Sequence, residues 1–445
     1  MSFNQRLREV REGFESAFWV ANISELFERI AFYGVQAVLA IYLHESLKFK
    51  QGEAGDLIGY FSGVVWFLPI LGGTLADRYG FRRSLTAAYV ILAGGYFLLG
   101  SLSAGWMGPL REALPLGAVV LMVMTVPAMG PAIVKPCVVG TTARACTENV
   151  RSLGYSIYYT LVNVGGMLGP LLALSVRRTM GIEQVFVVCA AIMLAMSVMT
   201  GALYREPRKA GEKQVASIGE SLRNLVTVLT NFRFMLFLVI FSGFWIMFWQ
   251  EFVSLPLFIR DAVNKDADIE LLLAVDPLVV VLLQIPISYA MRNVPAFRAM
   301  MLGMLVTSLA WVLLAAGNLG WQINGTFPLV GKVTGLPVVA AIALAVVAMG
   351  ELIQSPRFYE YVSRLAPPGQ QGVFMGFSFL PIAIGSATAG VIGGRLVESF
   401  GKSGAPHQMW WVITGIGLTT TALMWVYDRV YKPGEAEGEK AESRT

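Results

Sequence analysis

Long runs of apolar residues recur along the whole of this 445-residue chain. A helix needs about 20 mostly apolar residues to cross the hydrocarbon core of a bilayer. The chain holds twelve such runs, at residues 15–43, 54–76, 83–104, 114–143, 150–176, 182–204, 233–261, 269–291, 297–317, 335–364, 371–396 and 406–431. Charged residues make up only 14% of the chain, against about 25% in ordinary soluble domains. The sequence therefore predicts an all-α integral membrane protein with twelve transmembrane helices, and it excludes an ordinary soluble enzyme.

A polar stretch between the sixth and seventh runs divides the chain into two halves. We expect an N-terminal six-helix bundle over residues 1–204 and a C-terminal six-helix bundle over residues 233–431. Residues 205–232 form the expected cytoplasmic linker. Residues 432–445 are charged and poor in apolar side chains, which predicts a disordered cytoplasmic tail.

Lysine and arginine are concentrated in the loops on one side of the predicted membrane. The richer set of loops contains both chain termini and the polar linker. Because cytoplasmic loops are enriched in these two residue types, both termini are predicted to be cytoplasmic. The expected location is the cell membrane, which is the inner membrane in a Gram-negative cell. The net charge of +5 reflects this bias and does not indicate a nucleic-acid partner.

The loop after the second run carries an ordered motif. It reads Gly72-Gly73-Thr74-Leu75-Ala76-Asp77-Arg78-Tyr79-Gly80-Phe81-Arg82-Arg83. It resembles the motif G-x-x-x-D-R-x-G-x-R-[RK] of the major facilitator superfamily, which implies the fold of two six-helix bundles around a central site. The latch residues that this resemblance implies are Gly73, Asp77, Arg78, Gly80, Arg82 and Arg83. The alternative is a loop that collects arginines only because it is cytoplasmic.

The first run carries three ionisable residues, Glu25, Glu28 and Arg29. An ionisable side chain in the middle of a membrane helix costs about 2.5–3.5 kcal/mol on insertion scales, and is by default a functional hypothesis. At about 100° per residue the three side chains share one side of the helix, so we expect them to face the bundle interior. Glu25 and Arg29 are spaced to pair, which leaves Glu28 to bind another cation or a proton.

The same segment resembles a second, narrower signature. Glu25-Leu26-Phe27-Glu28-Arg29-Ile30-Ala31-Phe32-Tyr33-Gly34 is similar to the E-x-x-E-R-F-x-Y-Y-G signature of the proton-dependent oligopeptide transporter family, with departures at Ile30 and Phe32. Further matches are Lys135-Pro136, Asn163 before Gly165, Gly350-Glu351-Leu352-Ile353-Gln354-Ser355-Pro356, Leu365-Ala366-Pro367, and Gly372 with Gly376. The chain is identified by this resemblance as a divergent member of that family.

The resemblance implies a role for each matching residue. The proton-coupling residues would be Glu25, Glu28, Arg29 and Lys135, and Glu351 would hold the amino group of a substrate. Protonation of Glu28 would free Arg29 or Lys135 to bind a substrate carboxylate, which is the differential binding that coupling requires. The expected substrate-binding residues are Arg29, Tyr33, Gln36, Trp66, Lys135, Asn163, Trp249 and Glu351. The alternatives are an inert buried quartet, a neutral Glu351 bonded to backbone, and tryptophans that only pack.

Two positions depart together from the family pattern. Gln36 stands where the family usually has an arginine, and Trp249 stands where it has a glutamate. In the family these residues can form a salt bridge between the two halves, and losing only one would leave an unpaired buried ion. Glu251 lies about 200° around the helix from Trp249, so it cannot take the place of the missing carboxylate.

The sequence as a whole predicts a proton-coupled secondary active symporter. It would import di- or tripeptides, or a related amphoteric small molecule, by alternating access. Two alternatives remain, an exporter or exchanger of a non-peptide substrate with the same fold, and a membrane sensor that binds without transport. We expect no enzymatic activity, no metal site, and no cofactor other than the proton gradient. The expected partners are a small-molecule substrate, protons and the lipid bilayer, and the expected oligomeric state is a monomer.

Overall fold

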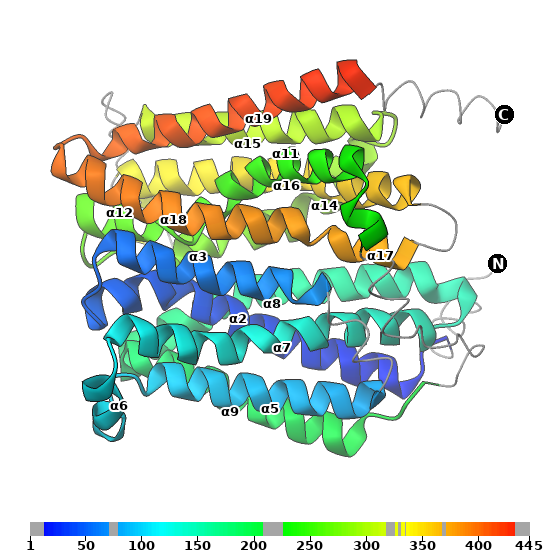
Figure 1. Ribbon diagram of the computed structural model, residues 1–445, viewed down its shortest axis with the longest axis horizontal. Helices are drawn as coiled ribbons and strands as arrows, with labels where there is room; N and C mark the ends of the chain where they lie inside the picture. Colours follow the sequence, from blue (N-terminus) through cyan, green and yellow to red (C-terminus); the bar gives the residue numbers. More distant parts are fainter. Residues whose placement is uncertain are drawn as a thin grey trace. The chain divides into compact units, whose positions relative to one another are not determined.

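The computed structural model describes residues 13–70, 79–207, 226–316, 325–327, 331–333, 335–366 and 371–431. Helices make up most of these residues (Figure 1). Eleven helices in the described part are long and apolar enough to cross a membrane. The prediction of a multi-pass, all-α membrane protein is therefore confirmed.

Among the described residues, the first half of the chain contributes six long helices and four short helical turns. These are α2 (Ser16–Ile41), η1 (Tyr42–Ser46), α3 (Gln51–Phe67), α5 (Phe81–Gly100), η2 (Gly105–Met107), α6 (Gly108–Ala113), α7 (Leu116–Arg144), η3 (Glu148–Val150), α8 (Arg151–Met180) and α9 (Ile182–Leu203). Helix α3 has 17 residues and corresponds to the predicted run 54–76, of which residues 71–76 lie outside the described part.

The second half is more interrupted than the sequence predicted. Its helical elements are α11 (Phe232–Phe248), η4 (Trp249–Glu251), α12 (Ser254–Ala262), α13 (Ile269–Leu273), α14 (Val275–Ala290), α15 (Ala296–Ala315), α16 (Gly335–Leu365), α17 (Gln371–Phe377), α18 (Leu380–Lys402), η5 (Pro406–Gln408) and α19 (Met409–Tyr431). Two short strands that were not predicted, β1 (Gly325–Phe327) and β2 (Gly331–Val333), pair antiparallel between α15 and α16. Helix α15 runs beside both α16 and α19 (Figure 1).

The described residues fall into two compact units. The first unit comprises Met1–Tyr42 and Val64–Leu222, and the second comprises Leu43–Gly63 and Arg223–Thr445. The segment 43–63, which includes most of α3, thus belongs with the second half of the chain. The reason is close packing of α3 on α18, because a Cβ placed on Gly55 would lie 2.4 Å from the carbonyl oxygen of Gly390.

Within the first unit, α2 is enclosed by α7, α8 and α9. Most of its residues are buried, including polar ones. Helix α8 comes very close at Gly165, where a Cβ would lie 2.6 Å from the Cβ of Arg29. Glycine at this position lets the backbone of α8 pack directly on the charged segment of α2.

Candidate functional site

Three charged side chains of α2 meet inside the first unit. Glu25, Glu28 and Arg29 are each at most 1% exposed. Nε of Arg29 donates a hydrogen bond of 2.5 Å to Oε2 of Glu28, and the same nitrogen lies 3.5 Å from Oε1 of Glu25. The one cation is therefore shared by two carboxylates.

Helix α7 brings a second cation to this cluster. Nζ of Lys135 lies 3.9 Å from Oε1 of Glu25, and the lysine side chain is 14% exposed. Lys135 is followed by Pro136 within the helix, and a proline inside a helix removes a backbone hydrogen bond and favours a bend. We call Glu25, Glu28, Arg29 and Lys135 the quartet. With both acids ionised and both bases protonated it carries no net charge.

The pairing inside the quartet agrees with the prediction at one contact and departs from it at another. The predicted contact between Arg29 and Glu25 is present at 3.5 Å, but Glu28 is not left without a cation, because the same arginine hydrogen-bonds it. Cζ of Arg29 lies 4.8 Å from the ring centroid of Phe32, which adds a cation–π contact. Glu25 instead lies between Arg29 and Lys135, and neither of its oxygens accepts a hydrogen bond within the described part of the chain.

Aromatic side chains line the quartet. Nζ of Lys135 lies 5.6 Å from the ring centroid of Trp66, so the tryptophan provides a cation–π contact. Phe32 stacks edge-on against Tyr33 with ring centroids 5.3 Å apart. Trp66 and Tyr33, both predicted to bind substrate, are thus brought to the region of the quartet, although neither role is tested by these contacts.

The two predicted site residues with amide side chains, Asn163 and Gln36, differ in their hydrogen bonding. Asn163 donates a hydrogen bond of 2.9 Å to the carbonyl of Tyr159, one turn earlier on α8. Gln36 is 1% exposed, and neither atom of its amide has a hydrogen-bond partner among the described residues. A buried amide without hydrogen-bond partners normally costs about 1–3 kcal/mol.

The other two predicted binding residues, Trp249 and Glu351, lie in the second unit. Trp249 is 2% exposed and packs against Phe252, with ring centroids 5.2 Å apart. Glu351 is half-buried on α16 and interacts electrostatically with two further carboxylates, Glu251 and Asp276. The sequence interpretation missed Asp276, although an acid inside the predicted run 269–291 was a visible signal.

The predicted latch motif is only partly described. Gly73, Asp77 and Arg78 lie outside the described residues. Gly80 has a φ of +82°, a conformation that favours glycine. The backbone N–H of Arg82 donates to Glu206 at 2.8 Å, and its guanidinium donates to the carbonyl of Gly201 at the end of α9. Arg83 is exposed, so the latch role of these residues remains a prediction.

A polar network that the sequence did not predict lies at one end of the second unit. Arg260 of α12 forms a two-pronged ion pair with Glu45 of η1, at 2.9 and 2.7 Å. Neither residue was among the predicted site residues.

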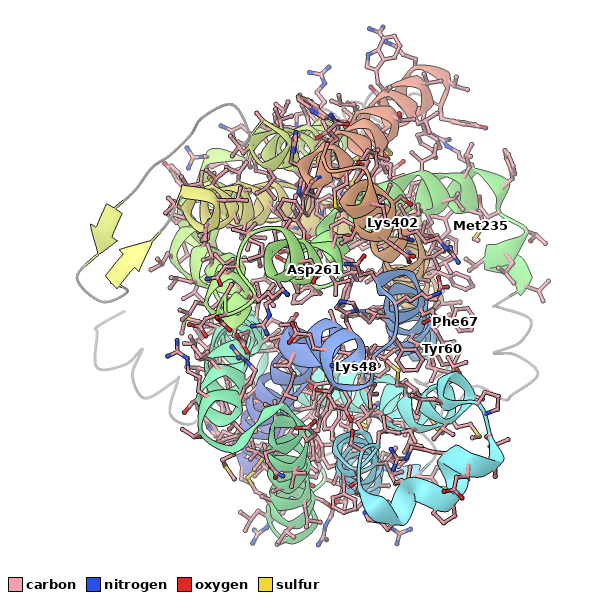
Figure 2. All side chains as sticks on the ribbon, turned by 90° about the vertical axis from the view of Figure 1, so that its left-hand side faces the viewer. Lys48, Tyr60, Phe67, Met235, Asp261 and Lys402 are labelled. Atoms are coloured by element: carbon pink, nitrogen blue, oxygen red, sulfur yellow. The ribbon has the colours of Figure 1, made fainter. Side chains whose placement is uncertain are left out.

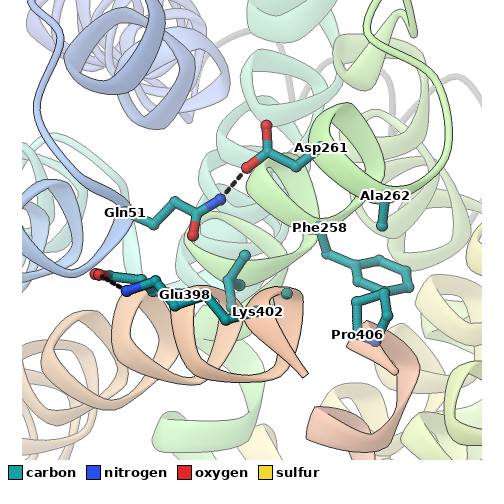
Figure 3. Close-up of a pocket in the computed structure, with 9 residues that line it drawn as sticks. Gln51, Phe258, Asp261, Ala262, Glu398, Lys402 and Pro406 are labelled. Carbon is teal, nitrogen blue, oxygen red and sulfur yellow. Dashed lines mark hydrogen bonds and ion pairs between the residues drawn. The ribbon is translucent and has the colours of Figure 1, made fainter. Parts of the chain in front are cut away.

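Two further contacts connect the segment 43–63 to the rest of the second unit. Arg395 of α18 pairs with Asp56 of α3 at 3.0 Å. Gln51 of α3 hydrogen-bonds the carboxylate of Asp261 (Figure 3). Asp261 and Lys402 lie at the face of the molecule shown in Figure 2.

Beside these contacts is a pocket of about 330 Å³. Its lining residues are Gln51, Phe258, Asp261, Ala262, Val397, Glu398, Gly401, Lys402 and Pro406 (Figure 3). Glu398 accepts from Lys402 at 2.7 Å, so the charged groups of the lining are largely satisfied by each other. The pocket belongs to the polar end of α12 and α18 and is not part of the quartet.

Known proteins resemble this chain, some over most of its length and some over part of it. The model of the Major Facilitator Superfamily matches residues 22–331. The "Multidrug resistance protein MdtH" of Aeromonas salmonicida is 22% identical over 410 residues, covering 91% of this chain and 94% of that protein. The "Dipeptide and tripeptide permease B" of Aliivibrio fischeri is 27% identical over 174 residues, covering 38% of this chain and 33% of that protein.

Solved structures of POT family transporters share the fold. One in complex with 5-aminolevulinic acid has a TM-score of 0.72 and 17% identity, covering 92% of this chain and 95% of that one. Another in complex with a thioalcohol conjugated peptide has a TM-score of 0.73 and 17% identity, covering 93% of this chain and 96% of that one. These likenesses establish the helical arrangement.

Proposed function

Because the chain belongs to the major facilitator superfamily, we propose that it is a proton-coupled symporter that imports a peptide-like or other amphoteric small molecule by alternating access. The protein is a multi-pass membrane transporter and not an enzyme. In this proposal both termini are cytoplasmic, the latch motif changes its contacts between conformations, and the monomer is the working unit.

The quartet is the observation that carries the proposal. Two acids and two bases balance inside the first unit, with Glu25 held by Arg29 at 3.5 Å and by Lys135 at 3.9 Å. A proton taken up by this group leaves one excess positive charge in a buried place. Because Arg29 keeps its hydrogen bonds to Glu28, protonation of Glu25 releases Lys135 rather than Arg29. The released ammonium can then bind a substrate carboxylate.

The release of Lys135 couples proton binding to substrate binding. If a proton raises the affinity for a substrate anion by a given factor, the substrate raises the affinity for the proton by the same factor. An amphoteric substrate suits the arrangement, since its carboxylate would pair with Lys135 and its amino group with an acid elsewhere. The 5-aminolevulinic acid bound to one POT family transporter has both groups, which supports the substrate class.

Uptake into proteoliposomes under an inward proton gradient tests the proposal. The purified protein should accumulate labelled di- or tripeptides, and Glu25→Gln or Glu28→Gln should lose gradient-driven accumulation by about tenfold or more while retaining counterflow exchange. Glu148→Gln, at an exposed acid of η3, is the matched control and should behave as the parent does. Full accumulation by Glu25→Gln and Glu28→Gln would refute the coupling role.

A second candidate is export or exchange of a non-peptide substrate. It is favoured by the relatives that cover the chain almost fully, since those carry the name "Multidrug resistance protein MdtH", whereas the dipeptide permease covers only 38% of it. Inverted membrane vesicles distinguish the candidates. Energy-dependent accumulation of a drug in such vesicles, without peptide uptake in proteoliposomes, would replace the import proposal by this one, and binding without flux would indicate a sensor.

A further inference from the structure

A buried asparagine lies one turn of α2 before the quartet. Asn22 and Glu25 are both 0% exposed, and three positions separate them within the same helix. Side chains three positions apart on a helix are neighbours, with about 5–6 Å between their Cβ atoms. The amide of Asn22 and the carboxylate of Glu25 therefore lie within reach of each other on one buried face.

The orientation of the Asn22 amide is fixed by its hydrogen bonds. Its Nδ2 donates to the carbonyl oxygen of Phe18 at 2.8 Å and to Oγ1 of Thr142, on α7, at 3.4 Å. A carbonyl oxygen can only accept, so the opposite orientation of the amide would place two acceptors against each other. Oδ1 is therefore the remaining atom of the amide, and it has no hydrogen-bond partner among the described residues.

The carboxylate of Glu25 lacks hydrogen-bond donors as well. Its Oε1 lies 3.5 Å from Nε of Arg29 and 3.9 Å from Nζ of Lys135. Neither of its oxygens accepts a hydrogen bond within the part of the chain that the structure describes. This face of α2 therefore holds two buried acceptors, an amide oxygen and a carboxylate, that lack a hydrogen between them.

A proton on Glu25 supplies the missing hydrogen. A protonated carboxyl group is a hydrogen-bond donor, and an amide oxygen is an acceptor. An unpaired buried acceptor costs free energy, and this cost is removed when the acceptor receives a hydrogen bond. The protonated state of Glu25 can thus satisfy two groups that the ionised state leaves without donors.

The charged and titratable groups around Glu25 come from three helices. They are Glu28 and Arg29 on α2, Lys135 on α7, and Tyr89 on α5, whose hydroxyl donates to Ser24 at 2.9 Å. Helices α8 and α9 also pack against α2, and among the described residues no charged group of either helix is at ion-pair distance from Glu25. Protonation of Glu25 weakens its ion pairs with Arg29 and Lys135, so a new hydrogen bond would offset part of that loss.

We propose that Asn22 is a positioning residue for proton coupling, and that its Oδ1 accepts a hydrogen bond from the carboxyl group of Glu25 when Glu25 is protonated. The bond exists in only one of the two protonation states, so Asn22 raises the affinity of Glu25 for the proton. This inference rests on the proposed function, which assigns the transported proton to the quartet, and it adds a neutral residue that determines how tightly the proton is held.

Infrared difference spectroscopy of the purified protein tests this hydrogen bond. Spectra taken over a range of pH, without substrate and without a gradient, show the carbonyl stretch of carboxyl groups that bind a proton. The band that is lost in Glu25→Gln belongs to Glu25, and its growth as pH falls gives the midpoint of protonation. Asn22→Leu should lower this midpoint by about one pH unit, or about tenfold in proton affinity, which is what one buried hydrogen bond contributes. The band should also move to higher frequency, because the carboxyl group loses a hydrogen bond.

The matched control is Thr142→Val, which keeps the shape of the side chain. It removes one hydrogen bond of the same amide but leaves Oδ1 of Asn22 in place, so the midpoint should equal that of the parent. Asn22→Ala should lower the midpoint in the same direction as Asn22→Leu, and it replaces that variant if the leucine prevents folding. A role of Asn22 in packing alone predicts one midpoint for all of these proteins.

An unchanged or raised midpoint in the Asn22 variants would overturn the proposal, and so would an equal fall in Thr142→Val or the absence of a band that Glu25→Gln removes. Uptake into proteoliposomes is a separate measurement. A lowered midpoint in Asn22→Leu, with no gradient-driven uptake by the parent protein, would support the hydrogen bond and refute the proposed function. Gradient-driven uptake by the parent with an unchanged midpoint in Asn22→Leu would refute the role of Asn22 alone.

Discussion

Removal of Lys135 should destabilise the first unit because it leaves the quartet with one excess negative charge. Nζ of Lys135 lies 3.9 Å from Oε1 of Glu25. At that distance and an effective dielectric constant of about 20, two unit charges attract by about 4 kcal/mol. Repulsion between Lys135 and Arg29 offsets part of this. We therefore expect Lys135→Met to lower the free energy of unfolding by about 2–3 kcal/mol.

A double-mutant cycle separates this ion pair from the other effects of the substitution. Glu25→Gln removes the charge that Lys135→Met leaves unbalanced, so the double variant should be more stable than the sum of the single effects allows. The expected coupling free energy is about 2 kcal/mol. It is measured by SDS titration of the four proteins in mixed micelles, with tryptophan fluorescence as the signal.

A second double-mutant cycle in the same assay tests whether Lys135 is paired with Glu25 or with Glu28. Lys135→Met with Glu28→Gln should show weaker coupling, because Glu28 is bonded to Arg29 and no ion pair joins it to Lys135 among the described contacts. Additive effects of Lys135→Met and Glu25→Gln would refute the assignment of Glu25 as the acid that holds Lys135.

Three further predictions follow from the packing and the exposure of single residues. Gly55→Leu should reduce transport about tenfold or more, because even a Cβ there would lie 2.4 Å from the carbonyl oxygen of Gly390, whereas Gly94→Leu, with open space around it, should transport normally in the same uptake assay. Gln36→Leu should raise the free energy of unfolding by about 1–2 kcal/mol, since it replaces a buried amide without partners; a loss of stability would show that the amide has one. Burial raises the pKa of Cys146 to about 11, so maleimide should label this thiol slowly at pH 7 and about tenfold faster per pH unit up to that value; fast labelling at pH 7 would contradict it.

The positions of the membrane helices could be predicted because the signal is local. A bilayer requires about 20 apolar residues in a row, and the run predicted at 182–204 became α9, Ile182–Leu203. Interruptions could not be predicted, since they depend on packing between distant segments. The run predicted at 371–396 is divided between α17 and α18.

The members of the quartet and the contact between Glu25 and Arg29 could be predicted, but not the hydrogen bond from Arg29 to Glu28. Charged residues inside an apolar run are visible in any sequence, and Lys135 was found by its family motif. The distances from Glu25 to Lys135 and from Glu28 to Arg29 were not visible in the sequence. These distances are set by tertiary packing, such as the close approach at Gly165.

The ion pair between Glu45 and Arg260 could not be predicted from the sequence either. Glu45 and Arg260 are separated by 215 positions, and each is an ordinary charged residue near the end of an apolar run. Their ion pair exists because η1 and α12 meet in the second unit, which no periodicity of one segment can indicate. The sequence therefore did not indicate this ion pair.

The central claim is that the quartet moves a proton together with substrate. It is tested most directly by substrate-driven proton uptake into proteoliposomes that contain a pH-sensitive dye. No proton gradient is imposed at the start. The parent protein should acidify the lumen when an inward gradient of a transported di- or tripeptide is applied, and Glu25→Gln should carry the peptide in counterflow without acidification. Acidification by Glu25→Gln at the rate of the parent would contradict the account.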